Sequence, residues 1–163
     1  MPPRSLRGCG VRATWLVTPA SAAVERLRAV DDFELGIHQN FAASSTHGSD
    51  FAAVLARCMD LVPGATTMRT HRLFQMTPLF DVLLEQTPIR ADLSLYLHRA
   101  PGLTPVTFRS AGRALHRFPT YWQDDQAMLE EAPCWDAATL LAPRGLKILN
   151  FHPMHVLLNS SSF

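Results

Sequence analysis

The sequence predicts an α/β protein built around a parallel sheet. Short β-branched or aromatic runs, typical of buried strands, alternate with segments in which apolar residues recur at helical spacing. Thr-Pro and Pro-Gly pairs separate many of these segments, as expected where helices begin and end. A length of 163 residues is enough for one sizeable core, so we expect a single domain over residues 1–163.

Each expected element has a local signal in its residues. The expected strands, rich in Val, Ile, Leu, Phe or Trp, are 11–17, 33–37, 66–69, 92–97, 115–118 and 146–151. The expected helices, which follow a residue able to cap or open a first turn, are 19–30, 50–61 and 78–84. A weaker helical region over 126–141 is interrupted by Pro133. The polar segment 39–48 and the Pro-, Gly- and Thr-rich segment 98–113 are expected to be loops.

Composition excludes several classes of protein. Apolar residues make up 47% and charged residues 18%, which is typical of a globular chain rather than a disordered one. Fifteen basic residues against fourteen acidic ones, without a long basic stretch, argue against nucleic-acid binding. The three cysteines, Cys9, Cys58 and Cys134, form no CxxC pair, which argues against a disulfide framework or a cysteine zinc knuckle.

The apolar runs are too short for a membrane span. Near the N-terminus, three arginines precede the apolar run 13–17, and the Ala-Ser-Ala sequence at residues 20–22 resembles a signal-peptidase cleavage site. That run is broken by Thr14 and is shorter than an ordinary signal-peptide core. We therefore expect a soluble cytoplasmic protein.

Polar side chains gather where three predicted strands end. His38 follows the strand 33–37, Arg69 ends the strand 66–69 with His71 just beyond it, and His152 follows 146–151 with His155 nearby. Ligands and catalytic groups of parallel α/β folds lie at the carboxyl edge of the sheet. These strand ends therefore predict a site. If the last strand continued, His152 and His155 would point to opposite sides.

The chemistry of these residues leaves alternatives open. His38 and His47, nine residues apart around a loop, could bind a metal or be solvated loop histidines. Asp124 and Asp125 could orient a histidine, bind a metal or open a helix. Arg69 could clamp a carboxylate or form a surface salt bridge. The aromatic side chains of Tyr121 and Trp122, which precede the two acids, and of Trp135 could stack on sugars or fill the core.

Six segments together resemble a known family. They are Val11-Arg-Ala-Thr-Trp-Leu-Val-Thr18, Phe33-Glu-Leu-Gly-Ile-His38, Ser44-Ser-Thr-His-Gly48, Met68-Arg-Thr-His71, Pro119-Thr-Tyr-Trp-Gln-Asp-Asp125 and Asn150-Phe-His-Pro-Met-His-Val156. In this order they are similar to the motifs of the polysaccharide deacetylase (NodB-homology) superfamily. The resemblance is narrower to a divergent branch associated with bacterial surface-polysaccharide gene clusters, including those of lipopolysaccharide biosynthesis. It covers nearly the whole chain.

The resemblance implies a distorted (β/α) barrel with fewer than eight strands and a metal-dependent hydrolase. The implied reaction removes an N-acetyl group from an amino sugar, with a divalent metal, expected to be zinc, activating water. His38 and His47 would be metal ligands and Arg69 would orient a carboxylate network. Asp124 or Asp125 would orient a histidine, and His152 would protonate the leaving amine. The residues His71, His155 and Trp122 would support these or contact the carbohydrate substrate.

The family's first motif, a strand ending in Asp-Asp, has no counterpart here, because no acid occurs before Glu25. A barrel without that strand exposes two strand edges, so self-association through them is expected to be possible. Activity is expected to be impaired, and an inactive carbohydrate-binding or assembly protein with the same fold is the alternative. A metal-dependent phosphoesterase fits less well, because the sequence has no glycine loop for phosphate.

Overall fold

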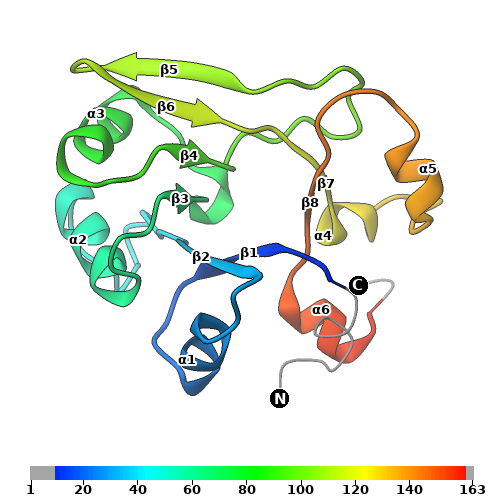
Figure 1. Ribbon diagram of the computed structural model, residues 1–163, viewed down its shortest axis with the longest axis horizontal. Helices are drawn as coiled ribbons and strands as arrows, with labels where there is room; N and C mark the ends of the chain where they lie inside the picture. Colours follow the sequence, from blue (N-terminus) through cyan, green and yellow to red (C-terminus); the bar gives the residue numbers. More distant parts are fainter. Residues whose placement is uncertain (1–9, 161–163) are drawn as a thin grey trace.

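The computed structural model describes residues 10–160 and confirms the α/β fold (Figure 1). In chain order the elements are β1 (Ala13–Val17), α1 (Ala22–Arg28), β2 (Phe33–Ile37), α2 (Phe51–Leu61), β3 (Thr67–Met68), the 3-10 turn η1 (His71–Leu73), α3 (Thr77–Gln86), β4 (Ala91–Asp92), β5 (Val106–Ser110), β6 (Arg113–Arg117), β7 (Thr120–Gln123), α4 (Asp124–Ala127), α5 (Ala137–Leu141), β8 (Ile148–Asn150) and α6 (Pro153–Leu158). No helix among these is long and apolar enough to cross a membrane.

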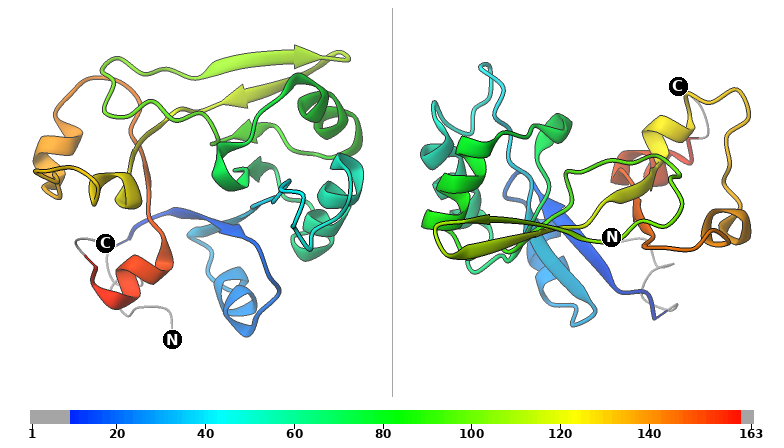
Figure 2. Two further views of the ribbon diagram at one scale, coloured as in Figure 1. Left: turned by 180° about the vertical axis from the view of Figure 1, so that it is seen from behind. Right: turned by 90° about the horizontal axis from the view of Figure 1, so that it is seen from above.

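The strands form two sheets rather than a closed barrel. The larger sheet has the order β1-β2-β3-β4-β6-β5, and every neighbouring pair is parallel except the antiparallel β5–β6 hairpin. The smaller sheet is the parallel pair β7–β8. Within residues 10–160, β1 pairs only with β2 and β8 only with β7. The expected incomplete barrel is therefore confirmed (Figure 2).

A short seam joins the two sheets. Tyr96 and Thr120 form an isolated parallel bridge, and the backbone N–H groups of Leu97 and Arg99 donate to the carbonyls of Thr120 and Tyr121. The segment after β4 thus runs along β7 and continues the strand layer. As a result, the carboxyl ends of β2, β3, β7 and β8 face one region of the molecule (Figure 1).

Two apolar clusters support the two sheets separately. Helices α1, α2 and α3 lie outside the larger sheet (Figure 1), and their buried residues pack against strand residues such as Ile37 and Met68. The smaller sheet has its own cluster of buried residues: Leu103, Tyr121, Trp122, Ala127 and Leu140. Burial of apolar area is the main favourable contribution in both.

The site-bearing strands β2 and β3 approach closely because β2 contains Gly36. A Cβ atom at this position would lie 2.7 Å from the carbonyl oxygen of Thr67. Only glycine therefore allows the two backbones to come this close.

Three expected elements differ from those observed. The expected strand 92–97 is only Ala91–Asp92, since the chain then leaves β4 to form the seam. The expected loop 98–113 contains β5 and the start of β6, joined by Ala111 and Gly112 with φ of 49° and 75°. Positive φ at both central residues gives a hairpin turn compatible with strand twist. The expected helix 126–141 is two short helices with irregular chain around Pro133 between them.

Candidate active site

The centre of the candidate site is a hydrogen-bonded pair, Asp124 and His152. Because β7 and β8 are parallel with Gln123 opposite Asn150, residues just beyond the two strand ends meet. The Asp124 carboxylate accepts two hydrogen bonds from His152. One comes from Nδ1 to Oδ1 and one from the backbone N–H to Oδ2, both 2.6 Å long.

This geometry fixes the imidazole of His152. With the Nδ1 proton shared with Asp124, the neutral ring has its lone pair on Nε2. The hydrogen bond from Asp124 raises the pKa of His152, against burial, which lowers it. Burial raises the pKa of Asp124, but the hydrogen bonds from His152 outweigh it and the net direction is down. The pair therefore favours a carboxylate beside an imidazolium.

Asp125 adds a second carboxylate to the pair. Single ligand atoms of Asp124, Asp125 and His152 lie within 4.8 Å of one another, the one such group of His, Cys, Asp and Glu among the residues that the structure describes. Asp124 and Asp125 also lie in the first turn of α4, as helix-opening acids do. The sequence left Asp124 and Asp125 as alternatives for the acid that orients a histidine. Asp124 is the one hydrogen-bonded to His152.

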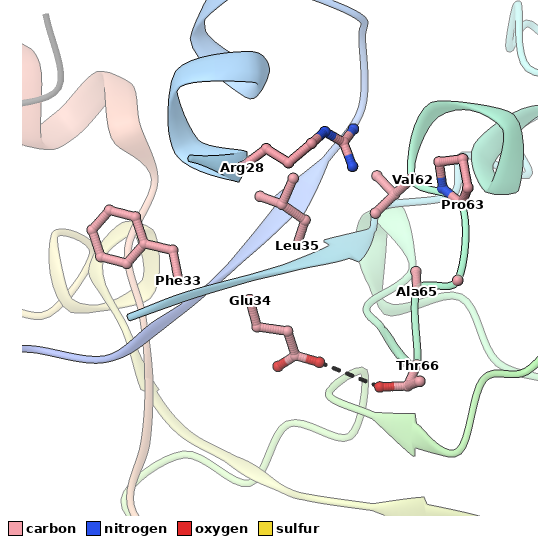
Figure 3. A pocket seen from close by; sticks show the side chains of 9 residues that line it. Arg28, Phe33, Glu34, Leu35, Val62, Pro63, Ala65 and Thr66 are labelled. Atoms are coloured by element: carbon pink, nitrogen blue, oxygen red, sulfur yellow. Dashed lines mark hydrogen bonds between the residues drawn. The ribbon is translucent and has the colours of Figure 1, made fainter. Parts of the chain in front are cut away.

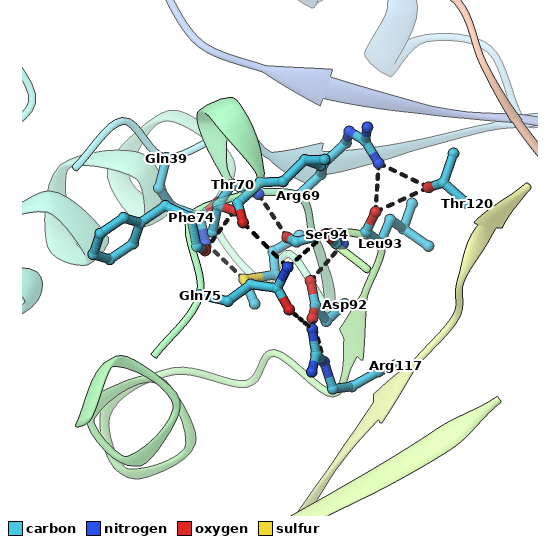
Figure 4. Close-up of polar contacts among 12 residues, drawn as sticks. Gln39, Arg69, Thr70, Phe74, Gln75, Asp92, Leu93, Ser94, Arg117 and Thr120 are labelled. Carbon is cyan, nitrogen blue, oxygen red and sulfur yellow. Dashed lines mark hydrogen bonds and ion pairs between the residues drawn. The ribbon is translucent and has the colours of Figure 1, made fainter. Parts of the chain in front are cut away.

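Arg69 connects the larger sheet to this pair. It follows β3, is 6% exposed, and donates to the Leu93 carbonyl and, at 2.7 Å, to Thr120 Oγ1 (Figure 4). It also donates to Gln123 Oε1 at 2.8 Å. The interpretation as a surface salt bridge is therefore wrong, because the guanidinium is buried. Burial lowers the pKa of Arg69, while the charges of Asp125 and Asp92 raise it.

The contacts of Arg69 lie directly before the acids in the chain. Gln123 is the last residue of β7 and directly precedes Asp124 in α4. The hydrogen bond from Arg69 to the Gln123 amide therefore fixes the position of the backbone next to the two acids. Thr120 and Gln123 were not singled out in the sequence. Their signal was the pair of polar residues flanking the two aromatics of the segment 119–125.

His38 has the properties of a neutral ligand. It follows β2, and its Nδ1 is buried without a hydrogen-bond partner in the described part of the chain. Burial, followed by the charge of nearby His71, lowers the pKa of His38 to about 4. The rings of His38 and His71 meet edge to face, with centroids 5.7 Å apart. A neutral imidazole with an unused nitrogen is what a zinc-type ion requires.

His47 fits a metal less well in this conformation. Its Nδ1 accepts a hydrogen bond of 3.2 Å from the Asn40 backbone N–H and lies 3.6 Å from Cys58 Sγ. A neutral ring that accepts at Nδ1 has its proton on Nε2, so neither nitrogen is available to an ion. The predicted pairing of His38 with His47 as metal ligands is therefore not formed by these contacts.

Of the remaining predicted residues, His155 lies at the site and Trp122 lies in the core. His155 lies in α6, and its ring meets that of His152 with centroids 5.8 Å apart. The expectation that the two histidines point to opposite sides is wrong, because β8 ends at Asn150. Trp122 and Tyr121 are each 1% exposed, so neither offers a face to a sugar. Trp122 instead packs against Trp135 and Phe151.

A cavity of about 230 Å³ lies away from this site (Figure 3). It is lined by residues around the start of β2 and the turn before β3, including Glu34 and Thr66. Glu34 accepts a hydrogen bond of 2.8 Å from Thr14 Oγ1 and is also bonded by Thr67. Since these are the amino ends of the strands, the cavity is separate from the carboxyl-edge site.

An unclosed (β/α) barrel with an Asp–His pair and a buried arginine at the carboxyl edge defines a polysaccharide-deacetylase-like α/β protein. The profile of the family described as WbmS-like, polysaccharide deacetylase, matches residues 4–163. The chain therefore belongs to the WbmS-like polysaccharide deacetylase family, which confirms the resemblance stated from the sequence.

One solved structure is similar over most of the chain. It is a candidate polysaccharide deacetylase from Bordetella bronchiseptica, described as involved in O-antigen biosynthesis. The two share 30% identity with a TM-score of 0.82, over 96% of this chain and 66% of the Bordetella chain. This chain thus spans slightly less than two thirds of the length of that protein. A comparison with curated proteins gives no significant match.

Proposed function

We propose that the chain provides the active site of a hydrolase that removes N-acetyl groups from an amino sugar of a bacterial surface polysaccharide. The observation that supports this most is His152 held through Nδ1 by Asp124, next to Asp125 at the ends of β7 and β8. Family membership and the O-antigen context of the Bordetella protein support this choice of substrate class.

Amide hydrolysis needs a nucleophilic water and a proton for the leaving amine. Water adds to the acetyl carbonyl carbon, the C–N bond breaks, and acetate and the free amino sugar are released. In our proposal His152 donates the Nε2 proton to the departing nitrogen, because the hydrogen bond to Asp124 raises its pKa and so favours the imidazolium. Asp124 is a positioning residue, and Asp125 is the candidate base for the water.

The family implies a divalent metal, and His38 is the residue that fits it. Its buried, unpartnered Nδ1 and neutral state are suited to a zinc-type ion, whereas the contacts of His47 would have to change. When bound, such an ion polarises the carbonyl and lowers the pKa of water. Arg69 follows β3 and donates to Gln123 at the end of β7, and we expect this bond to keep the acids and His38 on the same side.

The test measures amine release from N-acetylated chitooligosaccharides by the purified chain, with and without added zinc. We expect His152→Gln to reduce the rate by a factor of about 10²–10⁴, the usual range for loss of a general acid. His116→Gln is the matched control, since His116 is an exposed histidine on β6 whose ring nitrogen Nδ1 lies 3.2 Å from Thr107 Oγ1. Equal rates for wild type and His152→Gln would contradict the proposal.

A chain that binds the sugar but releases no amine under any metal condition would instead favour the inactive carbohydrate-binding alternative. Metal content separates the two further. We expect His38→Ala to lose bound zinc relative to wild type in elemental analysis.

A further inference from the structure

A second polar cluster lies beside the candidate site and has no role in the proposal above. The Tyr96 hydroxyl is 2.6 Å from His98 Nδ1, and His98 Nε2 is 2.7 Å from Glu130 Oε1. Arg99 lies 3.7 Å from the other oxygen of Glu130. The side chains of Tyr96, His98 and Glu130 thus form a continuous row of polar contacts, with Arg99 at the Glu130 end.

The seam positions this row against the site. Tyr96 pairs with Thr120, whose hydroxyl is bonded by Arg69. Tyr96 is partly buried, and burial raises its pKa to about 12, with a further increase from the charge of Asp125. The charge of Arg69 acts in the opposite direction. The phenol ring therefore lies within the electrostatic field of both Arg69 and Asp125.

The row determines how the Tyr96 hydroxyl is oriented. A Glu130 carboxylate beside Nε2 favours the proton on that nitrogen and leaves the lone pair on Nδ1. Tyr96 then donates its proton to His98, and its oxygen remains an acceptor. Because the phenol is already committed as a donor, a ligand group that meets it must itself donate. Hydroxyl groups of sugars are such donors.

We propose that Tyr96 is a substrate-binding residue, whose oxygen accepts a hydrogen bond from a sugar hydroxyl next to the reacting N-acetyl group. His98 and Glu130 are the positioning residues that orient it. This inference rests on the proposed function for the identity of the ligand as a carbohydrate. Tyr96 lies in the segment after β4, whereas the other site residues follow β2, β3, β7 and β8. The proposal thus adds a residue that would help select the substrate.

The test uses direct binding, so it does not depend on turnover. The probe is tetra-N-acetylchitotetraose, titrated into the wild-type chain and four variants by calorimetry. Loss of one hydrogen bond predicts about fivefold weaker binding for Tyr96→Phe. His98→Leu should give a similar loss, and the double variant should bind no more weakly than either single variant, because the residues act as one unit. His116→Leu is the matched control and should bind as wild type.

Folding is checked by the thermal midpoint of each variant. A separate readout is the ¹⁵N shifts of the His98 ring, where Nε2 is expected to be protonated in the wild-type chain. In Tyr96→Phe, the ¹⁵N chemical shift of His98 Nδ1 should move toward the value of an unprotonated ring nitrogen that accepts no hydrogen bond. This change reports the Tyr96–His98 contact in the absence of any sugar.

The outcomes distinguish this inference from the proposed function. Tyr96-dependent binding without amine release would overturn deacetylation by this chain and support the inference. Amine release with unchanged binding and KM in Tyr96→Phe would overturn the inference alone. Absence of probe binding by the wild-type chain, or additive losses in the double variant, would also overturn it.

Discussion

The Asp124–His152 pair predicts a pH-dependent contribution to stability that Asp124→Asn should remove. Asparagine keeps the shape of the side chain but loses its charge, so the bond from Nδ1 becomes an ordinary one. A hydrogen bond to a charged group contributes about 1.5–3 kcal/mol. His152 is 43% exposed, so solvent screening reduces this value. We expect a loss of about 1 kcal/mol from the free energy of unfolding.

The direction in which this stability contribution changes with pH follows from the two pKa shifts. His152 has its pKa raised above 6.5, so its contribution is fully present below pH 6.5 and is lost as pH rises through the folded-state pKa. Asp124 has its pKa lowered below 3.8, so its contribution is present above pH 3.8 and is lost as pH falls through the folded-state value. The difference between wild type and Asp124→Asn should therefore be largest between pH 3.8 and 6.5.

The measurement combines urea unfolding at several pH values with an NMR titration of the His152 ring. In Asp124→Asn, the pKa of His152 should fall toward 6.5. An unchanged pKa of His152, or a stability difference that grows above neutral pH, would refute the assignment of Asp124 as its partner.

Three other substitutions test the framework around the site. Arg69→Ala removes the donor to Thr120, Gln123 and the Leu93 carbonyl, and should lower the free energy of unfolding in urea by about 3 kcal/mol. A decrease below about 0.5 kcal/mol would contradict the role of Arg69 in joining the sheets. Gly36→Ala should cost about 2 kcal/mol in the same measurement, because its Cβ meets a backbone oxygen at 2.7 Å; wild-type stability would show that β2 and β3 lie further apart. Trp122→Ala should cost about 4 kcal/mol, well above the loss for the 41% exposed Trp135→Ala, and the reverse order of the two would contradict a core role for Trp122.

Much of the fold could be predicted from local patterns. The runs 11–17 and 33–37 contain strands within their expected bounds, because β-branched and aromatic residues pack well on a half-buried sheet. The hairpin β5–β6 was missed, since the segment rich in Pro, Gly and Thr concealed a two-residue turn at Ala111 and Gly112. Tertiary pairing decides such a hairpin, and Val106 at its edge is itself half exposed.

The candidate site was predictable in outline and not in its contacts. Histidines at strand ends could be found because parallel strands bring their carboxyl ends together. The partner of each histidine depends on loop paths that spacing alone does not determine. The loop 39–48 turns the Nδ1 of His47 onto the Asn40 backbone, and the α6 turn brings His155 onto His152. The row from Tyr96 to Glu130 joins residues from two segments with no shared motif.

The seam between the two sheets gives the molecule a place to open without complete unfolding. One bridge, a few backbone bonds and the Arg69 side chain join two clusters that are otherwise packed separately. A local opening along this line would separate Asp124 and His152 from His38 while the larger cluster stays intact. Hydrogen exchange would then show the amides of β7 and β8 exchanging as one cooperative unit, ahead of those of β2. We therefore expect the integrity of the site to follow the opening of this seam rather than the global stability of the chain.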